Sequence, residues 1–179
     1  MALLAEELVE EWLNRQGYFT IRGIKLGVHE IDLLAVRLGQ SGVECRHIEV
    51  QASVRPVSYI TPLPIATQRR TGRAAGSAKE RSDDELREGI GEWVKKKFDH
   101  PPKTKLRTQL RHGDWTRELV VHVVRHEREL ELIRDAGIKV HRLADIVREL
   151  KHGDFVIEGA AGANLVDLVS MDLRPEPDA

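Results

Sequence analysis

The sequence has little of several features that mark large classes of protein. It holds one cysteine, Cys45, which excludes an intrachain disulfide and a zinc site built from cysteines, and which favours a reducing cytoplasm. Aromatic residues make up 4% of the chain and do not interleave with its basic residues, as they do where single-stranded bases stack. No apolar run approaches the roughly 18 residues of a membrane span, and the first residues include acids rather than the basic start of a signal peptide. We therefore expect no membrane attachment.

The composition is otherwise that of a globular protein with a locally basic segment. The 179 residues are 41% hydrophobic and 32% charged, which predicts one domain over residues 1–173 and a flexible tail at 174–179. The net charge of -1 gives no overall sign of a nucleic-acid partner. Between residues 54 and 117, however, fifteen Lys and Arg stand against eight Asp and Glu, an excess of seven. Such a segment suits either a phosphate-binding surface or a solvated helix and loop.

The chain begins with the pattern of an amphipathic helix over residues 3–16, closed by Gly17. Its apolar face is formed by Ala5, Leu8, Val9, Trp12 and Leu13. Glu6 lies at the edge of this face, so it could point inward, or it could be a solvated charge.

Three strands are predicted next, over residues 18–26, 29–36 and 46–51, and the Gly39-Gln40-Ser41-Gly42 turn supplies glycines for a hairpin between the last two. Side chains two apart on a strand share a face, so Glu49 and Gln51 point together. Neighbouring strands can bring Asp32 close to Glu49. Because like charges repel, a proton or a cation must then lie between them, and hard carboxylate oxygens suit Mg²⁺.

A long loop is predicted over residues 54–83, because the segment contains three prolines and lacks periodicity. We expect its basic residues to contact nucleic-acid phosphates; they include Arg55, Arg69, Arg70, Arg73 and Lys79.

A helix over residues 84–98 follows, capped by Ser82 or Asp83. Lys97 lies on its apolar face, where an ammonium is costly unless it meets an anion or water. His100-Pro101-Pro102 is interpreted as the stop of this helix, followed by a basic stretch over residues 103–112.

The last part of the chain alternates between strand and helix. A near-continuous apolar run within residues 117–124 indicates a strand buried on both faces. The remaining predictions are helices over residues 127–136, 144–151 and 164–171, and a short strand over 138–143. This order implies an α/β fold with a mixed sheet.

A helix bearing Glu6, a strand bearing Asp32, and a further strand bearing Glu49-Val50-Gln51 follow one another. This order resembles the PD-(D/E)XK nuclease superfamily, the restriction-endonuclease-like fold, and is similar to the cores of Holliday-junction resolvases and Mrr-like restriction enzymes. The resemblance implies a mixed central sheet in the order αβββαβ, flanked by helices, with an extra C-terminal strand and helices. It also implies a magnesium-dependent nuclease that cuts DNA, accepts Mn²⁺ in place of Mg²⁺, and can form a homodimer.

The resemblance implies roles for individual residues. Asp32 and Glu49 would bind the metal with the carbonyl of Val50, and Glu6 would support them from the helix. Gln51 occupies the position of the superfamily's lysine. Glutamine can orient a water molecule but carries no charge, so transition-state stabilisation would be lost unless a lysine elsewhere replaced it. Lys97 is our candidate for a lysine that has moved to the following helix.

Two other functions stay open. The chain could be a nucleic-acid-binding module that keeps the nuclease fold but cuts slowly or not at all, which Gln51 favours. It could also be a protein-interaction domain with a vestigial site. For single residues, Lys97 could extend its ammonium to solvent, and Asp32 and Glu49 could be surface acids.

Overall fold

The computed structural model describes residues 2–40, 42–53 and 55–171, and the predicted tail at 174–179 lies outside them. The helices are α1 (Ala2–Arg15), α2 (Ile65–Thr71), α3 (Asp83–Lys97), α4 (Pro101–Leu110), α5 (Glu127–Asp135), α6 (Leu143–His152) and α7 (Ala163–Met171). The strands are β1 (Phe19–Leu26), β2 (His29–Gly39), β3 (Gly42–Gln51), β4 (Thr116–Val121) and β5 (Lys139–Arg142). No helix in these ranges is both long and apolar enough to span a membrane.

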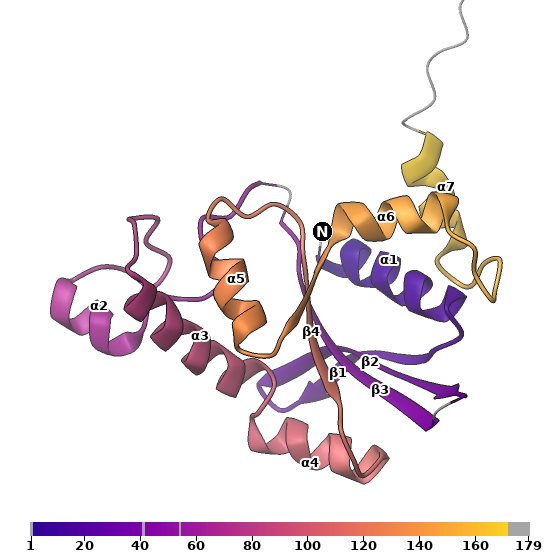
Figure 1. Cartoon of the computed structure of the whole chain (residues 1–179), viewed down its shortest axis with the longest axis horizontal. Helices are drawn as coiled ribbons and strands as arrows, with labels where there is room; N and C mark the ends of the chain where they lie inside the picture. Colours follow the sequence, from indigo (N-terminus) through magenta and orange to yellow (C-terminus); the bar gives the residue numbers. More distant parts are fainter. Residues whose placement is uncertain (1, 41, 54, 172–179) are drawn as a thin grey trace, which may run out of the picture.

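One five-stranded sheet carries the fold, and its strands lie in the order of the chain (Figure 1). β1, β2 and β3 form an antiparallel meander, while β4 pairs parallel to β3 and β5 parallel to β4. The sheet is therefore mixed, as predicted. The parallel pairing requires a long crossover from β3 to β4, and this crossover contains α2, α3 and α4.

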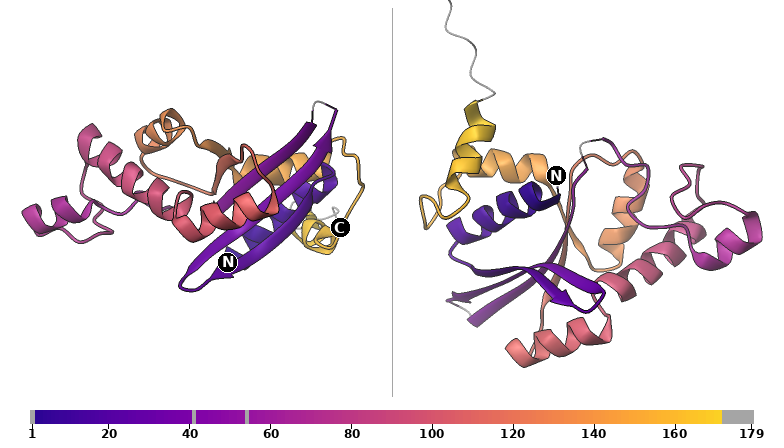
Figure 2. Two further views of the ribbon diagram at one scale, coloured as in Figure 1. Left: turned by 90° about the horizontal axis from the view of Figure 1, so that it is seen from below. Right: turned by 180° about the vertical axis from the view of Figure 1, so that it is seen from behind.

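Helices cover both faces of the sheet (Figures 1 and 2). Leu13 of α1 packs with Ile146 of α6 and Val166 of α7 in one hydrophobic core. Trp93 of α3 and Leu130 of α5 belong to a second core. β4 supplies both cores, because its successive residues alternate between faces: Val120 lies in the first core, and Leu119 and Val121 lie in the second.

The predicted start of α3 is confirmed. Ser82 is the N-cap: its hydroxyl accepts a hydrogen bond from the Glu85 N–H, and the Glu85 carboxylate accepts one from the Ser82 N–H. This reciprocal capping box satisfies two amides at the helix start and fixes where α3 begins.

Two helices were missed in the crossover. The segment predicted as one long loop contains α2, which begins after Pro64. The proline pair was predicted to stop the preceding helix, and α3 does end before it. The prediction did not include α4, whose first turn is formed by Pro101 and Pro102. Proline suits that turn, because its fixed φ matches a helix and its missing N–H would be unpaired there anyway.

The predicted strand over residues 117–124 was too long at its end. β4 stops at Val121, and Val124 instead makes an isolated parallel bridge with Val57. The near-continuous apolar run did not mark this boundary, since Val123 and Val124 continue it past the end of the strand.

Candidate active site

Asp32 and Glu49 lie on adjacent strands and on one face of the sheet. The pairing of β2 with β3 includes Leu33 opposite Ile48, so one step further along Asp32 falls opposite Glu49. At this point the Asp32 side chain reaches across to β3: its Oδ2 accepts a hydrogen bond of 2.7 Å from the Val50 N–H. The two acids and the Val50 main chain therefore meet at one place.

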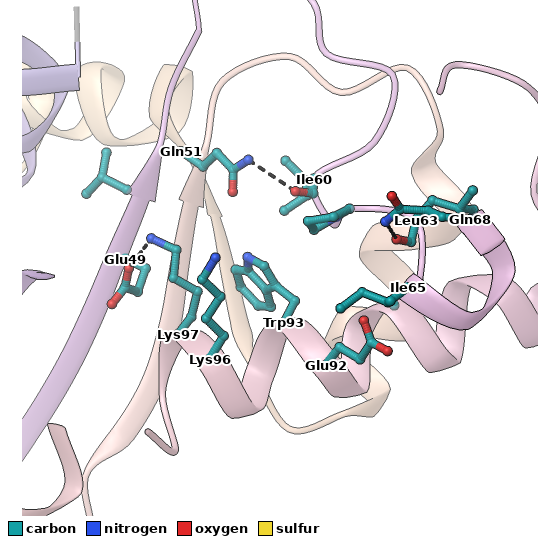
Figure 3. A pocket seen from close by; sticks show the side chains of 13 residues that line it. Glu49, Gln51, Ile60, Leu63, Ile65, Gln68, Glu92, Trp93, Lys96 and Lys97 are labelled. Atoms are coloured by element: carbon teal, nitrogen blue, oxygen red, sulfur yellow. Dashed lines mark hydrogen bonds and ion pairs between the residues drawn. The ribbon is translucent and has the colours of Figure 1, made fainter. Parts of the chain in front are cut away.

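Glu49 is buried among cations, with an exposed fraction of 1%. Its Oε2 accepts a hydrogen bond of 2.7 Å from Lys97 Nζ of α3 (Figure 3). Its Oε1 accepts bonds from Lys103 Nζ of α4 at 2.8 Å and from His47 Nε2 at 3.0 Å. Burial acts to raise the pKa of the Glu49 carboxyl, but His47 and the two lysines outweigh it and hold that pKa below its ordinary value. Glu49 is thus kept ionised.

His47 is a fixed hydrogen-bond donor to Glu49. Arg107 Nη1 of α4 lies 2.9 Å from His47 Nδ1, and because a guanidinium can only donate, Nδ1 must accept. The proton of the neutral ring is then on Nε2, which donates to Glu49. Burial lowers the pKa of His47, although Glu49 opposes this, and Arg107 and Lys103 lower it further. The ring is therefore neutral and holds the carboxylate in place.

The negative charge around Asp32 is not balanced in the same way. Burial raises the pKa of the Asp32 carboxyl to about 6, and the charge of Glu49 adds to that effect. Glu6 also acts on Asp32, and its own pKa is raised by burial, then by Glu30 and, more weakly, by Glu49. The three acids selected from the sequence thus lie within electrostatic reach of one another. The pKa of Asp32 stays raised because the Val50 N–H and the charge of Lys97 do not fully offset burial and the charge of Glu49.

The structure brings together Asp32, Glu49 and Lys97, which the sequence had put forward, and adds three residues that it had not. One of these is His47, which lies two positions before Glu49 on β3, so the two side chains share a face. Lys103 and Arg107 are the other two, and the sequence placed them only in a basic stretch, because α4 was missed and because a buried charged residue gives no hydrophobic signal. Lys103 has an exposed fraction of 1% and Arg107 one of 8%.

Gln51 points to the same side as Glu49 and lines a cavity of about 420 Å³ beside it (Figure 3). Its Nε2 donates a hydrogen bond of 3.1 Å to the carbonyl of Ile60, in the segment that leads to α2. Glu129 of α5, which is fully buried, accepts bonds from the N–H groups of Ile60 and Thr61 and from the Thr61 hydroxyl. α5 therefore fixes the segment against which Gln51 rests.

The basic residues of the crossover take two different positions. Arg69 and Arg70 are exposed on α2, and Arg55 and Lys79 are exposed in the flanking segments. Arg73 is instead partly buried: it forms an ion pair of 3.0 Å with Glu85 and donates to the carbonyls of Lys79 and Glu80. Its guanidinium is thus engaged in holding the loop.

In the described part of the chain, no three His, Cys, Asp or Glu side chains gather closely enough to hold a metal ion by themselves. Asp32 and Glu49 nevertheless offer hard oxygen donors next to the Val50 main chain, and the raised pKa of Asp32 marks a deficit of positive charge there. Two carboxylates are a sufficient protein contribution for Mg²⁺, which keeps several waters. The residues therefore fit this ion. No known protein family, curated protein or solved structure matches the chain.

Proposed function

We propose that this protein is a magnesium-dependent nuclease with a restriction-endonuclease-like core, and that it hydrolyses phosphodiester bonds in DNA. One observation carries the proposal. Two acids on neighbouring strands, Asp32 and Glu49, meet on one face of the sheet, and the ammonium of Lys97 contacts the second. An anionic substrate that is cut with metal assistance needs both parts: oxygens to hold the ion and a cation beside them.

Asp32, Glu49 and the carbonyl of Val50 would hold the ion, with Mn²⁺ able to replace Mg²⁺. A bound divalent cation polarises the phosphate and lowers the pKa of a coordinated water. The chain favours its binding in two ways. Glu49 is ionised by its lysine and histidine partners, and Asp32 has a raised pKa that a cation would relieve. Glu6 adds negative charge from α1 and supports the ion from a greater distance.

In this proposal Lys97 and Lys103 together replace the single lysine of the PD-(D/E)XK superfamily, whose position Gln51 occupies. The Lys97 side chain is 35% exposed, so its ammonium can turn toward a phosphate. The Lys103 side chain is 2% exposed and its Nζ also donates to the Lys97 carbonyl, so it stays on Glu49. Glu49 therefore remains paired when Lys97 contacts the substrate. Gln51 positions a water molecule through its amide, without adding charge.

The exposed basic residues of the crossover extend this site toward the DNA backbone. Arg55, Arg69, Arg70 and Lys79 contact phosphates in the proposal, whereas Arg73 holds the loop that presents them. Phosphate contacts of this kind give affinity that falls with salt and does not depend on sequence. A homodimer in the cytoplasm, with two sites for two strands, is part of the same proposal.

A second candidate function is a nucleic-acid-binding module that cuts slowly or not at all. It is favoured by Gln51, whose amide already bonds to Ile60, and by Glu49, both of whose oxygens already accept bonds from lysines. The two functions differ in their need for metal. If the chain is such a module, it binds DNA equally well in Mg²⁺ and in EDTA, and it cleaves no form of DNA.

The experiment compares DNA cleavage by the wild-type chain and by Asp32→Asn, in Mg²⁺, in Mn²⁺ and in EDTA. Asp84→Asn is the matched control, since Asp84 is an exposed acid on α3. We expect metal-dependent cleavage that Asp32→Asn reduces by about a hundredfold or more while DNA binding persists, and that Asp84→Asn leaves unchanged. A folded wild-type protein that cleaves no DNA in either metal, or an Asp32→Asn variant with full activity, would overturn the nuclease. Glu49→Gln, checked for folding by circular dichroism, is the second variant.

A further inference from the structure

The cavity beside Glu49 extends well beyond the carboxylates. It lies between the end of β3, the segment from Ile60 to Gln68, and α3 (Figure 3). Its volume of about 420 Å³ falls within the range of small-ligand sites. Hydrolysis of a backbone phosphate needs only the carboxylate end. The remaining space is therefore large enough for a further group of the substrate.

One side of this cavity is apolar and contains an aromatic ring. Ile60, Leu63 and Trp93 line it, and all three are buried in the fold. Ile65 stands at its edge and is 56% exposed. Apolar walls with one aromatic ring suit a flat, hydrophobic ring system, which gains free energy by stacking.

Two amides give the cavity hydrogen-bonding groups of fixed orientation. Gln51 Nε2 donates to the Ile60 carbonyl at 3.1 Å, and Gln68 Nε2 donates to the Leu63 carbonyl at 2.6 Å. Each bond uses one of the two amide hydrogens and thereby decides which end of the amide is nitrogen. Each bond leaves the amide its second N–H and its carbonyl oxygen, so Gln68 can use both toward a ligand, and Gln51 can use one toward a ligand and the other toward the water that it positions. The ligand that matches these amide groups is a ring system with hydrogen-bond donors and acceptors along one edge.

The walls of the cavity are held at a fixed separation. A Cβ at Gly89 of α3 would lie 2.9 Å from the Pro62 carbonyl oxygen, so the helix and the segment touch backbone to backbone there. On the other side, Glu129 fixes the main chain of Ile60 and Thr61. The cavity is thus preformed, which reduces the ordering cost of binding.

Lys96 and Lys97 line the cavity together with Glu49, so its occupant lies next to the place where the proposed nuclease holds a phosphate. We propose that the cavity receives one unpaired nucleobase of the DNA strand, which brings the phosphate beside that nucleotide to Glu49 and Lys97. This inference rests on the proposed function and deepens it. The favoured substrate is DNA with a bulged or otherwise unpaired nucleotide, because such a base leaves the helix at a lower cost than a paired one.

The test uses duplexes that carry a single bulged 2-aminopurine nucleotide, an abasic nucleotide at the same place, or no bulge. Binding is measured in EDTA, where no cutting occurs, together with the protection of 2-aminopurine fluorescence from acrylamide. Cleavage is measured separately in Mg²⁺. Ile65→Trp narrows the cavity from an exposed position, and Leu168→Trp is the matched control, since Leu168 is 64% exposed on α7.

We expect the bulged base to be protected from acrylamide and the abasic bulge to bind about tenfold more weakly, since stacking a base contributes on this scale. Ile65→Trp should abolish the protection and the tenfold preference, and Leu168→Trp should retain both. Equal binding of the base-containing and abasic bulges, or protection that persists in Ile65→Trp, overturns the inference even if Mg²⁺-dependent cleavage is found. Protection of the base without any cleavage of DNA supports the base site and contradicts the proposed nuclease function. Failure of the inference and failure of the proposed function therefore give different results.

Discussion

Lys97 Nζ lies 2.7 Å from Glu49 Oε2, and this contact joins the middle of the sheet to the last turn of a helix 48 positions further along the chain. The lysine is the more exposed member of a pair whose other member, Lys103, is buried against the same carboxylate. An ammonium placed in this way is within reach of the carboxylate and of anything that enters the neighbouring cavity.

Lys97→Met should therefore reduce cleavage far more than it reduces DNA binding. Removing one charged group that stabilises a developing negative charge costs about a hundredfold in rate. Lys95→Met is the control, because Lys95 is exposed on the same helix. Single-turnover rates and binding isotherms separate the two effects. If the Lys97→Met variant cleaves DNA with the rate constant of the wild type, Lys97 has no role in the cleavage step.

Asp32→Asn should stabilise the metal-free protein at neutral pH. Burial and the charge of Glu49 raise the pKa of Asp32 to about 6 in the folded state, above its ordinary value of 3.8. Between these two values the folded state binds a proton that the unfolded state has lost, so stability falls as pH rises through this window. Asparagine avoids that loss and can still accept the bond from Val50.

The expected gain for Asp32→Asn is about 3 kcal/mol at pH 7 in EDTA, and it should fall below about 1 kcal/mol near pH 4, where the folded-state carboxyl is protonated and the unfolded-state carboxyl is about half protonated. Urea unfolding at the two pH values measures it. A gain of the same size at pH 4, or no gain at pH 7, would contradict the electrostatic account of Asp32.

Lys103→Met should destabilise the fold strongly. Lys103 is buried, and its loss leaves one oxygen of the buried Glu49 without its cation. Breaking such a pair costs about 3–5 kcal/mol. Denaturant unfolding of Lys103→Met beside Lys105→Met, which changes an exposed residue of α4, gives the comparison. Equal midpoints for the two variants would show that the buried pair contributes nothing.

Glu129→Gln should loosen the segment that borders the cavity without unfolding the domain. The buried carboxylate accepts hydrogen bonds from two main-chain N–H groups, at Ile60 and Thr61, and an amide group cannot accept all of them. Amide hydrogen exchange at these two residues should become much faster than in the wild type. Protection of amides in β3 is the internal reference, and unchanged exchange at Ile60 would count against the anchoring role of Glu129.

The sequence predicted most elements whose signal is local. The Ser82 cap, the apolar face of α1 and the glycines between β2 and β3 each act over a few residues, and their predictions agree with the structure. Lys97 could be selected as well, because its place on an apolar helix face was unusual in itself. The features that could not be predicted depend on contacts between residues that are far apart in the sequence. Nothing near Lys103 or Arg107 in the sequence shows that they are buried, since the side chains of β3 that they contact, Glu49 and His47, lie more than fifty positions earlier in the chain.

The missed helices have a related cause. α2 and α4 both follow prolines, and proline ends one helix as readily as it begins the next. Distinguishing the two outcomes requires knowing what the following residues pack against. α4 contacts the polar group around His47, and polar contacts of this kind leave no hydrophobic periodicity in the sequence of the helix.

Because β4 joins the sheet next to β3, Arg46 and Glu118 form their buried ion pair across 72 positions of chain. All three cations that hold His47 and Glu49 belong to the stretch between these two strands. During synthesis, Glu49 is therefore made well before these three cations. Glu49 therefore gains Lys97 and Lys103 only after α3 and α4 have been translated. The pairing of β3 with β4 also joins segments far apart in the sequence, and contacts of this kind slow folding.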